Sequence, residues 1–389
     1  MEMWSLSLRT CRFRTAAAVM AFASSHGVMA QSSVSLYGVA DDSLTYLSNR
    51  GGHSSIAMSS GGRGSSKWGF VGTEDLGGGV SAFFRMENGF DINNGQLGNN
   101  GRLFGRQAFV GLSSPYGTIQ LGKTYDLIVT YLNPNAASVR LGGGLMSHAG
   151  DADNIYGTYP ISNALKYETP IFAGTTVGVI YAPGGTAGSF ATNSIYGVGV
   201  KGAQGNFSFA AAYSHVDNPA VTLWDSSASD AAGGSFSNPL SNRTYSGYAS
   251  AKSYSVGAVS LGYSLGLASV GVIVSNTRYA DVVPTVTTPL AGTHFLRNAE
   301  FNFLYQLTPT LLLGAGANYT KGENSHYWQA NSSVQYLLSK RTYVYAIAVY
   351  QRAAGIDSTG KAAVANLYGQ TASTSPNDVG MRVGVRHSF

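Results

Sequence analysis

Short stretches in which apolar and polar residues alternate recur along most of this chain of 389 residues. In residues 378–389, Met381, Val383 and Val385 share one parity, whereas Arg382 and Arg386 share the other. A period of two indicates a β-strand with one apolar and one polar face. A soluble protein turns the apolar face into its core, and a membrane barrel turns it toward lipid. A single strand therefore leaves both structures open.

The composition favours the membrane barrel. Only 11% of the residues are charged, against about 25% in a typical soluble domain. Glycine (50 residues) and tyrosine (24 residues) are abundant. The most apolar runs, such as 311–317, are short and contain glycine. No stretch therefore approaches the roughly 20 apolar residues that a spanning helix needs.

The pattern predicts sixteen strands, joined by short turns that mostly alternate with longer links that are polar or rich in Gly and Ser. The predicted strands are residues 33–47, 65–73, 80–90, 102–112, 118–123, 163–168, 175–181, 194–201, 207–215, 254–263, 269–279, 295–307, 311–320, 326–338, 342–352 and 378–389. Residues 244–253 fit either a strand or a loop. An even number of strands in up-and-down order, with short turns at one end and long loops at the other, describes an all-β transmembrane antiparallel barrel. Closing the barrel pairs every backbone N–H and C=O and leaves no edge strand.

The first thirty residues have the pattern of a secretory signal peptide. Three arginines precede the apolar run 16–23, and Val28 and Ala30 meet the size requirement for cleavage. We predict cleavage after Ala30, so that residues 31–389 form the mature barrel, which amino-terminal sequencing of outer-membrane material tests. Cys11, the only cysteine, lies in the removed part. Cleavage removes three arginines and one glutamate, so the net charge falls from +5 to +3, a mild excess that does not predict nucleic-acid binding.

Several motifs of the chain resemble those of the general porins of Gram-negative bacteria, in particular their β-proteobacterial branch. The motifs are Ser33-Val-Ser-Leu-Tyr-Gly-Val39, Lys67-Trp-Gly-Phe-Val-Gly-Thr-Glu-Asp-Leu-Gly-Gly-Gly79, Arg106-Gln-Ala-Phe-Val-Gly-Leu-Ser113, Leu121-Gly-Lys123, Leu338-Ser-Lys-Arg-Thr342 and Gly384-Val-Arg-His-Ser-Phe389. The resemblance spans the mature chain and implies a trimer of sixteen-stranded barrels, each with its own water-filled pore. It implies a third long loop that folds inward and narrows the pore. It also implies that Phe389 closes the barrel and is read by the assembly machinery.

Carried over by position, the resemblance implies a set of residues at the narrowest part of the pore. The expected wall residues are Lys67, Arg85, Glu87, Arg106 and Lys123. Arg85 belongs to this set because it shares the parity of Glu87, and Lys123 lies at the foot of the inward loop. Lys67 and Arg106 are expected to project into the narrowest part, where low-dielectric walls strengthen each charge. Together with the positive net charge, they predict a weak preference for anions.

The presumed inward loop, residues 125–162, carries Asp126, Asp151 and Asp153. These carboxylates can face the basic wall and set a transverse field across the pore, or they can cap helices and turns within the loop. The loop lacks the Pro-Glu-Phe-Gly-Gly stretch of the family and reads Leu141-Gly-Gly-Gly-Leu-Met-Ser-His148 instead. Asp42 has the parity of the outward face, where a subunit interface or a position beside a loop would tolerate it.

The predicted function is a passive diffusion channel for ions and small hydrophilic solutes in the bacterial outer membrane, with no catalysis, cofactor or metal. The expected partners are further copies in a homotrimer, outer-membrane lipid including lipopolysaccharide, the barrel-assembly machinery and the solutes themselves. Two alternatives remain, namely a surface adhesin that uses the long loops and an outer-membrane hydrolase. Residues 262–266 match Gly-x-Ser-x-Gly, but a nucleophile elbow needs a following helix. Here a strand pattern resumes at Ser269, which favours a tight turn.

Overall fold

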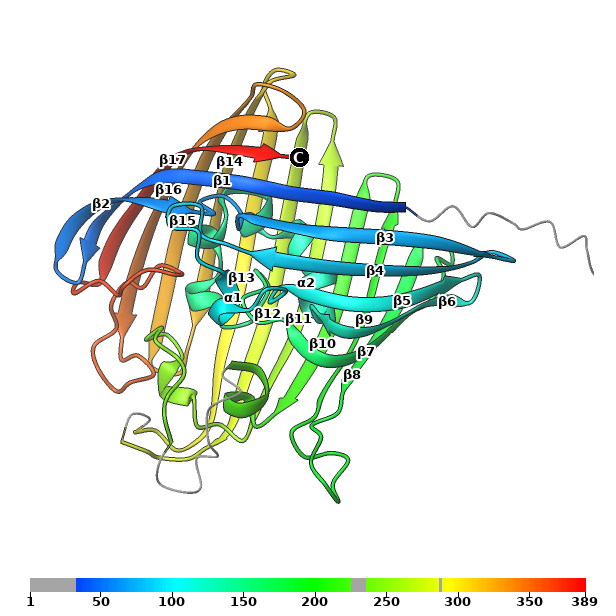
Figure 1. The fold of residues 1–389 in the computed structure, drawn as a ribbon. Coiled ribbons are helices and arrows are strands. Elements are labelled where there is room, and N and C mark those ends of the chain that lie inside the picture. The colour runs from blue at the N-terminus through cyan, green and yellow to red at the C-terminus, as the bar shows by residue number, and fades with distance from the viewer. Residues whose placement is uncertain (1–32, 225–235, 287–288) are drawn as a thin grey trace, which may run out of the picture.

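Seventeen strand segments form one closed antiparallel sheet in a computed structural model of the chain (Figure 1). The structure describes residues 33–224, 236–286 and 289–389. The first strand, β1, pairs with the last, β17, from Val39–Ser388 to Leu47–Gly380, and this pairing closes the barrel. The predicted signal peptide, residues 1–30, lies outside the described residues and stays a prediction.

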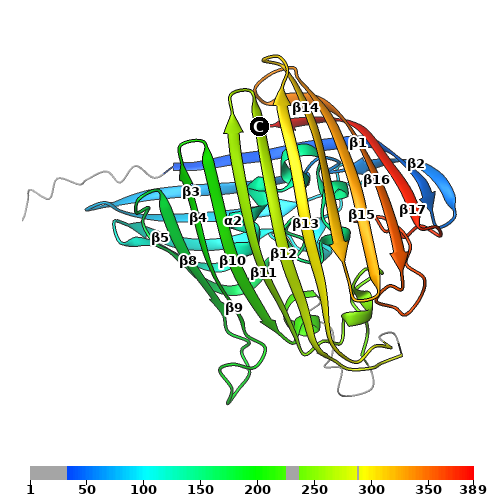
Figure 2. The ribbon, with the colours of Figure 1, turned by 180° about the vertical axis from the view of Figure 1, so that it is seen from behind.

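The strands are joined by short turns at one end of the barrel and by longer loops at the other end (Figure 2). Their bounds are β1 Ser33–Arg50, β2 His53–Ser60, β3 Lys67–Gly77, β4 Val80–Gly89, β5 Gln107–Ser114, β6 Gly117–Thr124, β7 Ile161–Glu168, β8 Thr175–Ala182, β9 Ile195–Gln204, β10 Phe207–Asp217, β11 Ser253–Leu265, β12 Ala268–Val282, β13 Gly292–Gln306, β14 Leu311–Lys321, β15 Ser325–Leu337, β16 Thr342–Gly355 and β17 Asn377–Ser388.

Two of these segments, β2 and β3, occupy a single strand position. Strand β1 pairs with β2 along residues 42–50 and with β3 along residues 33–39, so the two segments follow one another beside β1. Residues 61–66 interrupt them as a short insert. The seventeen segments therefore fill sixteen positions, which confirms the predicted number of strands. The sequence predicts no strand between residues 47 and 65, where the Gly- and Ser-rich residues 49–64 are expected to form a loop, and this expectation is wrong because β2 lies within them.

The predicted alternation of faces is confirmed. On β13, Phe301 is 51% exposed on the outer face, whereas Glu300 and Asn302 are buried on the inner face. On β17, Val383 is exposed outside and Arg382 is buried inside. On these strands the outer face is therefore apolar and the inner face polar, as lipid outside and water inside require.

Phe389 completes the closure at the end of β17. Its backbone N–H donates to the Gly38 carbonyl, and its own carbonyl accepts from the Gly38 N–H, both at 3.0 Å. The ring lies over Gly38, where any Cβ would collide with it. Its role as an assembly signal stays a prediction.

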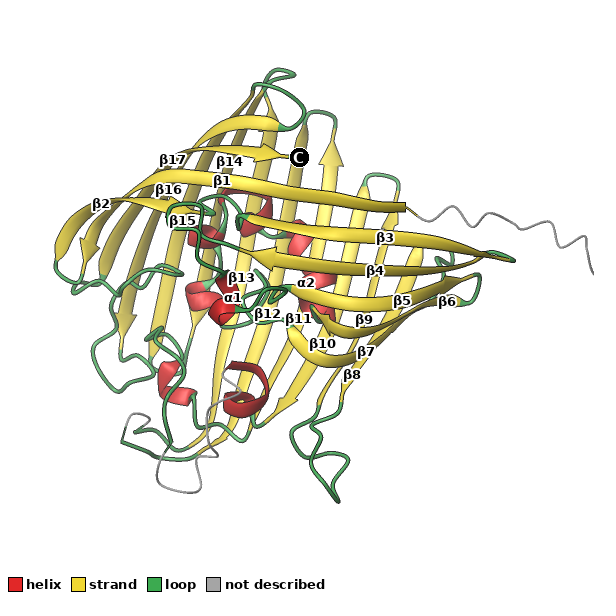
Figure 3. Cartoon of the chain, in the orientation of Figure 1, coloured by secondary structure: helices red, strands yellow, loops and turns green. Residues whose placement is uncertain are grey.

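The helical segments of the described residues are all short, and most belong to residues 125–162 (Figure 3). Their bounds are α1 Gly98–Gly101, α2 Leu127–Leu132, η1 Asn133–Asn135, η2 Ser138–Gly142, η3 Gly144–Met146, η4 Ala149–Asp151, η5 Ala220–Trp224 and η7 Ser246–Tyr248. Across the described ranges, no helix has the length and apolar character to cross a membrane. The ambiguous stretch 244–253 is a loop that contains η7, and β11 begins only at its last residue.

Candidate functional site

Residues 125–160, which connect β6 to β7 and make up nearly all of the presumed inward loop, fold into the barrel. Helix α2 opens this segment, and Leu127, Ile128 and Leu132 are all at most 1% exposed. They pack in one apolar cluster with inward-facing residues of the wall such as Ile180 and Ile273. Since burying one such side chain contributes about 1.5–3 kcal/mol, this packing holds the segment firmly against one side of the lumen. The predicted inward loop is thus present in the structure.

Hydrogen bonds fasten the rest of the segment to strands β12–β15. The backbone N–H of Ala137 donates to Glu300, and Arg140 donates to Asn302. Further along, Gln329 donates to the backbone carbonyls of Leu145 and Ser147. These inward-facing polar residues of the wall are therefore engaged by the segment.

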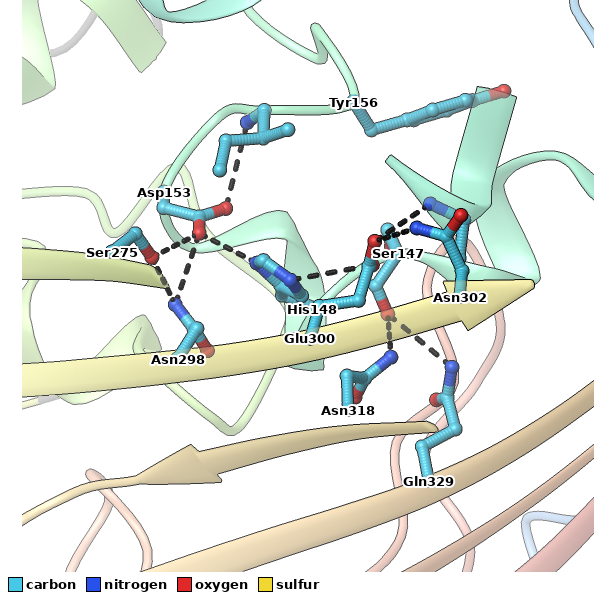
Figure 4. A network of polar contacts seen from close by, with 12 residues as sticks. Ser147, His148, Asp153, Tyr156, Ser275, Asn298, Glu300, Asn302, Asn318 and Gln329 are labelled. Carbon is cyan, nitrogen blue, oxygen red and sulfur yellow. Dashed lines mark hydrogen bonds and ion pairs between the residues drawn. The ribbon is translucent and has the colours of Figure 1, made fainter. Parts of the chain in front are cut away.

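His148 lies at the centre of a buried polar network between the segment and the wall (Figure 4). Its Nδ1 is 2.7 Å from Asp153 Oδ2, and its Nε2 is 3.4 Å from Glu300 Oε2. Asp153 also accepts hydrogen bonds from Ser275 and Asn298 on the wall. Burial alone would disfavour the imidazolium, but the carboxylates of Asp153 and Glu300 raise the pKa of His148 well above its ordinary value. His148 is therefore a buried cation that joins the segment to β13.

The three acidic residues of the segment each interact with other groups of the same segment. Asp126 caps α2 by accepting from the Val129 N–H at 2.8 Å. Asp151 accepts from the Tyr156 N–H and from the Thr158 hydroxyl, and burial together with the charge of Asp153 raises its pKa to about 7. Asp153 pairs with His148. All three are at most 5% exposed, so they do not form an acidic face opposite the basic wall, and the capping alternative holds for Asp126 and Asp151.

Lys67 and Arg106 lie together on the opposite wall, over a buried carboxylate. Lys67 Nζ is 3.2 Å from Glu87 Oε2, and Arg106 Nε is 2.7 Å from Glu87 Oε1. The Tyr37 hydroxyl also donates to Glu87. The side chain of Glu87 is 1% exposed, against 27% for Lys67 and 18% for Arg106. Glu87 thus orients the two cations, and the cations, unlike the carboxylate, are exposed to the lumen.

A second group of cations surrounds Asp41, further along the same wall. Asp41 is fully buried, accepts from the backbone N–H of Arg63, and lies 3.6 Å from Nη1 of Arg386. Arg382 donates to Thr45 Oγ1 and to the Gly62 carbonyl. The sequence reading did not select these three arginines. The parity of Arg382 and Arg386 on β17 could have revealed them, whereas Arg63 depends on the insert between β2 and β3.

The two groups line one cavity of about 620 Å³ between the wall and the inward segment. Its cationic lining residues are Arg63, Lys67, Arg106, Arg382 and Arg386, and Asp91 is the one carboxylate among its lining residues. The inward segment contributes neutral groups to it, among them Tyr156 and Thr158. The cavity is therefore polar and has an excess of positive charge, which low-dielectric walls strengthen.

Two of the expected wall residues lie apart from this cavity. Arg85 stacks over the ring of Tyr37 at 5.8 Å, nearer the turn between β3 and β4. Lys123 donates to Ser162 at 2.9 Å at the foot of the inward segment, where the pairing of β6 with β7 shifts register. Asp42 accepts from Asn93 of the β4–β5 connection at 3.1 Å, which is a position beside a loop.

A closed barrel with an apolar outer face and a polar inner face defines the class of outer-membrane β-barrel proteins. The sequence profile of Gram-negative porins matches residues 15–355, so the chain belongs to that family and is an outer-membrane protein. It is 33% identical over 171 residues to an outer membrane porin of Bordetella pertussis, a match that covers 39% of this chain and 43% of the relative. It is 31% identical over 170 residues to outer membrane porin protein 32 of Delftia acidovorans, covering 42% and 48%.

The chain thus spans less than half the length of these curated relatives. Among solved structures, it resembles the anion-selective porin from Comamonas acidovorans with a TM-score of 0.71 at 20% identity, covering 92% of this chain and all of the other. The trimer form of OmpT from Vibrio cholerae has a TM-score of 0.59 at 15% identity, covering 92% and 99%. At this level of sequence identity, both similarities establish a shared fold and nothing beyond it.

Proposed function

We propose that the protein is a passive diffusion channel for ions and small hydrophilic solutes across the outer membrane. The observation that carries this proposal is the polar cavity between the basic wall and the inward segment. Solutes pass through such a space without a chemical step, and no cofactor or metal takes part. The pore wall acts by its width and by the charges that it presents.

The charges of the cavity favour anions. Five cations line it, and Glu87 and Asp41, which offset part of this charge, are buried beneath them. The acidic residues of the inward segment are turned into the segment or the wall and do not line the cavity. The solved porin from Comamonas acidovorans is described as anion-selective, which supports the same preference here.

We also propose that the protein assembles as a homotrimer, with lipopolysaccharide and the barrel-assembly machinery as further partners. Among the described strands, β2 is paired on one edge only, with β1. Its outer face exposes Ile56 and Met58 by 67% and 55%. An open strand edge beside exposed apolar residues is a surface that proteins normally cover. A trimer form of a protein with this fold supports the stoichiometry.

The proposal gives no role to a catalytic serine. Ser264, within the Gly-x-Ser-x-Gly match, lies at the end of β11, and β12 begins at Ala268. The match is therefore part of a tight hairpin, without the helix that a nucleophile elbow needs.

Refolded protein in a planar bilayer tests the channel function directly. We expect discrete conductance steps of uniform size, and swelling of proteoliposomes in small sugars that falls as the sugar grows. Protein unfolded by heating is the control and should give neither signal. Well-folded barrels that give no conductance steps and no swelling would contradict the proposal.

A further inference from the structure

Part of the long connection between β10 and β11 is buried in the mouth of the barrel. Every residue from Thr244 to Ala251 is buried, although these residues belong to a loop at the open end. Connecting loops normally run over the surface, where water satisfies their backbone groups. We call residues 242–251 the cover. Its burial means that other parts of the protein supply the contacts that water gives to an ordinary loop.

Aromatic side chains hold one side of the cover against the wall and the inward segment. Tyr248 packs on Tyr279 of β12 with ring centroids 5.0 Å apart, and it stacks on His294 of β13 at 4.7 Å. The hydroxyl of Tyr245 lies 3.3 Å from that of Tyr159 in the inward segment. Buried aromatic rings contribute much of the energy of a packed contact. This side of the cover is therefore firmly fixed.

The other side of the cover joins the connection between β16 and β17, residues 356–376, through Arg243. The Arg243 guanidinium lies 2.6 Å from Asp357, whose side chain is fully buried. The backbone N–H of Arg243 donates to Asn366 at 3.0 Å, and its carbonyl accepts from the Ser358 hydroxyl at 2.8 Å. This joint is therefore made of polar contacts that centre on one residue.

The two connections also approach each other closely at Gly247. Its N–H donates to the Ser358 hydroxyl at 2.9 Å, and a Cβ on Gly247 would collide with the Ser358 carbonyl oxygen. The φ of Gly247 lies outside the left-handed region, so the close approach, and not the backbone conformation, requires glycine here. A single added methyl group is therefore enough to separate the two connections.

The β16–β17 connection forms one edge of the cationic cavity. Tyr368 and Gln370 line the cavity, and residues 363–367 directly before them are buried. The ring of Tyr368 packs edge to face on Tyr156 of the inward segment, with centroids 5.2 Å apart. The position of this edge therefore depends on where the connection is held, and the joint at Arg243 is one of the places that hold it.

We propose that the cover and the β16–β17 connection form a clasp, closed by Arg243, that sets the width of the pore. With the clasp closed, the connection keeps Tyr368 against the inward segment and the cavity stays narrow. Arg243 is 25% exposed, so water can replace its partners, whereas the aromatic contacts keep the cover in place. When Arg243 is released, the connection moves away from the inward segment and the cavity widens. The proposal rests on the proposed channel function, because it concerns the width of the same cavity.

Single-channel recording of two variants tests the clasp. Arg243→Gln removes the guanidinium at the centre of the joint, and Gly247→Ala forces the two connections apart without a change of charge. We expect both to show a larger mean conductance and additional conductance levels. Their zero-current potential should stay that of wild type, because Arg243 does not line the cavity. The control Gly257→Ala should conduct as wild type, since a Cβ there meets only Tyr213 at an ordinary 3.9 Å.

Amide hydrogen exchange of the folded barrels in detergent gives a second readout, which does not need conduction. Exchange in residues 363–370 should be about tenfold faster in both variants than in wild type, and exchange in β11 and β12 should stay unchanged. Wild-type conductance in both variants, or unchanged exchange in residues 363–370, would overturn the clasp. A wild-type protein that does not conduct would instead contradict the channel function, and the exchange rates would still decide whether the clasp exists.

Discussion

His148 has two carboxylate partners in a fully buried site, and its charge holds the inward segment to the wall. An imidazole that becomes neutral there would leave Asp153 and Glu300 without the cation between them. Because its folded pKa is raised, the stabilisation is fully present below the unfolded value of about 6.5. It is lost as the pH rises through the raised folded pKa. Alkaline conditions should therefore loosen the segment.

The variant His148→Gln tests this cation. Removing one partner of a buried ion pair costs about 3–5 kcal/mol, so the variant should unfold at a lower temperature near neutral pH and show noisier open-channel current. The difference from wild type should shrink at alkaline pH. Heat-modified gel mobility and single-channel recording measure the two effects, with exposed His53→Gln as control. A constant difference between the proteins at every pH would contradict a protonated His148.

The residues that the sequence analysis placed correctly in the cavity came from the family resemblance and not from parity, since Arg85, which parity added, lies apart from it. Lys67 and Arg106 were selected, and both line the cavity. Arg382 and Arg386 have equally clear parity on the last strand, but the family resemblance did not point to them. The partners of Asp151 and Asp153 could not be read from the sequence, because they depend on how residues 125–162 fold and on wall residues more than a hundred positions away.

At the scale of elements, the strands were predictable because lipid and water enforce a strict period of two. Long strands such as β13 and β15 lie close to their predicted bounds. The break between β2 and β3 was not predicted, because Gly and Ser are frequent both in loops and in this interrupted strand. The inserted residues 61–66 carry Arg63 into the cavity, so the missed irregularity is also a missed part of the site.

The inward segment touches this insert at Gly143. Gly143 has φ +76°, and a Cβ there would lie 2.6 Å from the Arg63 carbonyl oxygen. Gly143→Val should cost about 1–3 kcal/mol in backbone strain and push the segment off the insert, so single-channel conductance should rise. Gly266→Val is the control, because Gly266 has φ +56° with nothing within 4 Å of its Cβ position. A folded Gly143→Val barrel with wild-type conductance would show that this contact does not set the pore.

For the whole molecule, we expect a trimer that resists detergent and dissociates on heating. Opening a barrel in lipid would leave backbone groups unsatisfied at several kcal/mol each, which keeps every subunit intact. Ile56→Asn with Met58→Asn should give monomers by light scattering in mild detergent, because it disturbs the exposed face beside the open edge of β2. Val177→Asn with Val179→Asn makes the same change on the outer face of β8 and should leave the trimer. A wild-type monomer, or equal loss of trimers in both variants, would count against this interface.

The central claim is that the basic wall makes the pore prefer anions, and the zero-current potential across a bilayer in a KCl gradient tests it most directly. Wild-type protein should give the sign of an anion-preferring pore. Lys67→Glu with Arg106→Glu should shift the potential toward cations at low salt. The shift should shrink as salt rises, because the Debye length falls from about 10 Å at 0.1 M to about 3 Å at 1 M. Lys340→Glu with Arg341→Glu, the same charge change at an exposed turn, should leave the potential unchanged. A cation-preferring wild type, or an unchanged potential in the folded wall variant, would contradict the account.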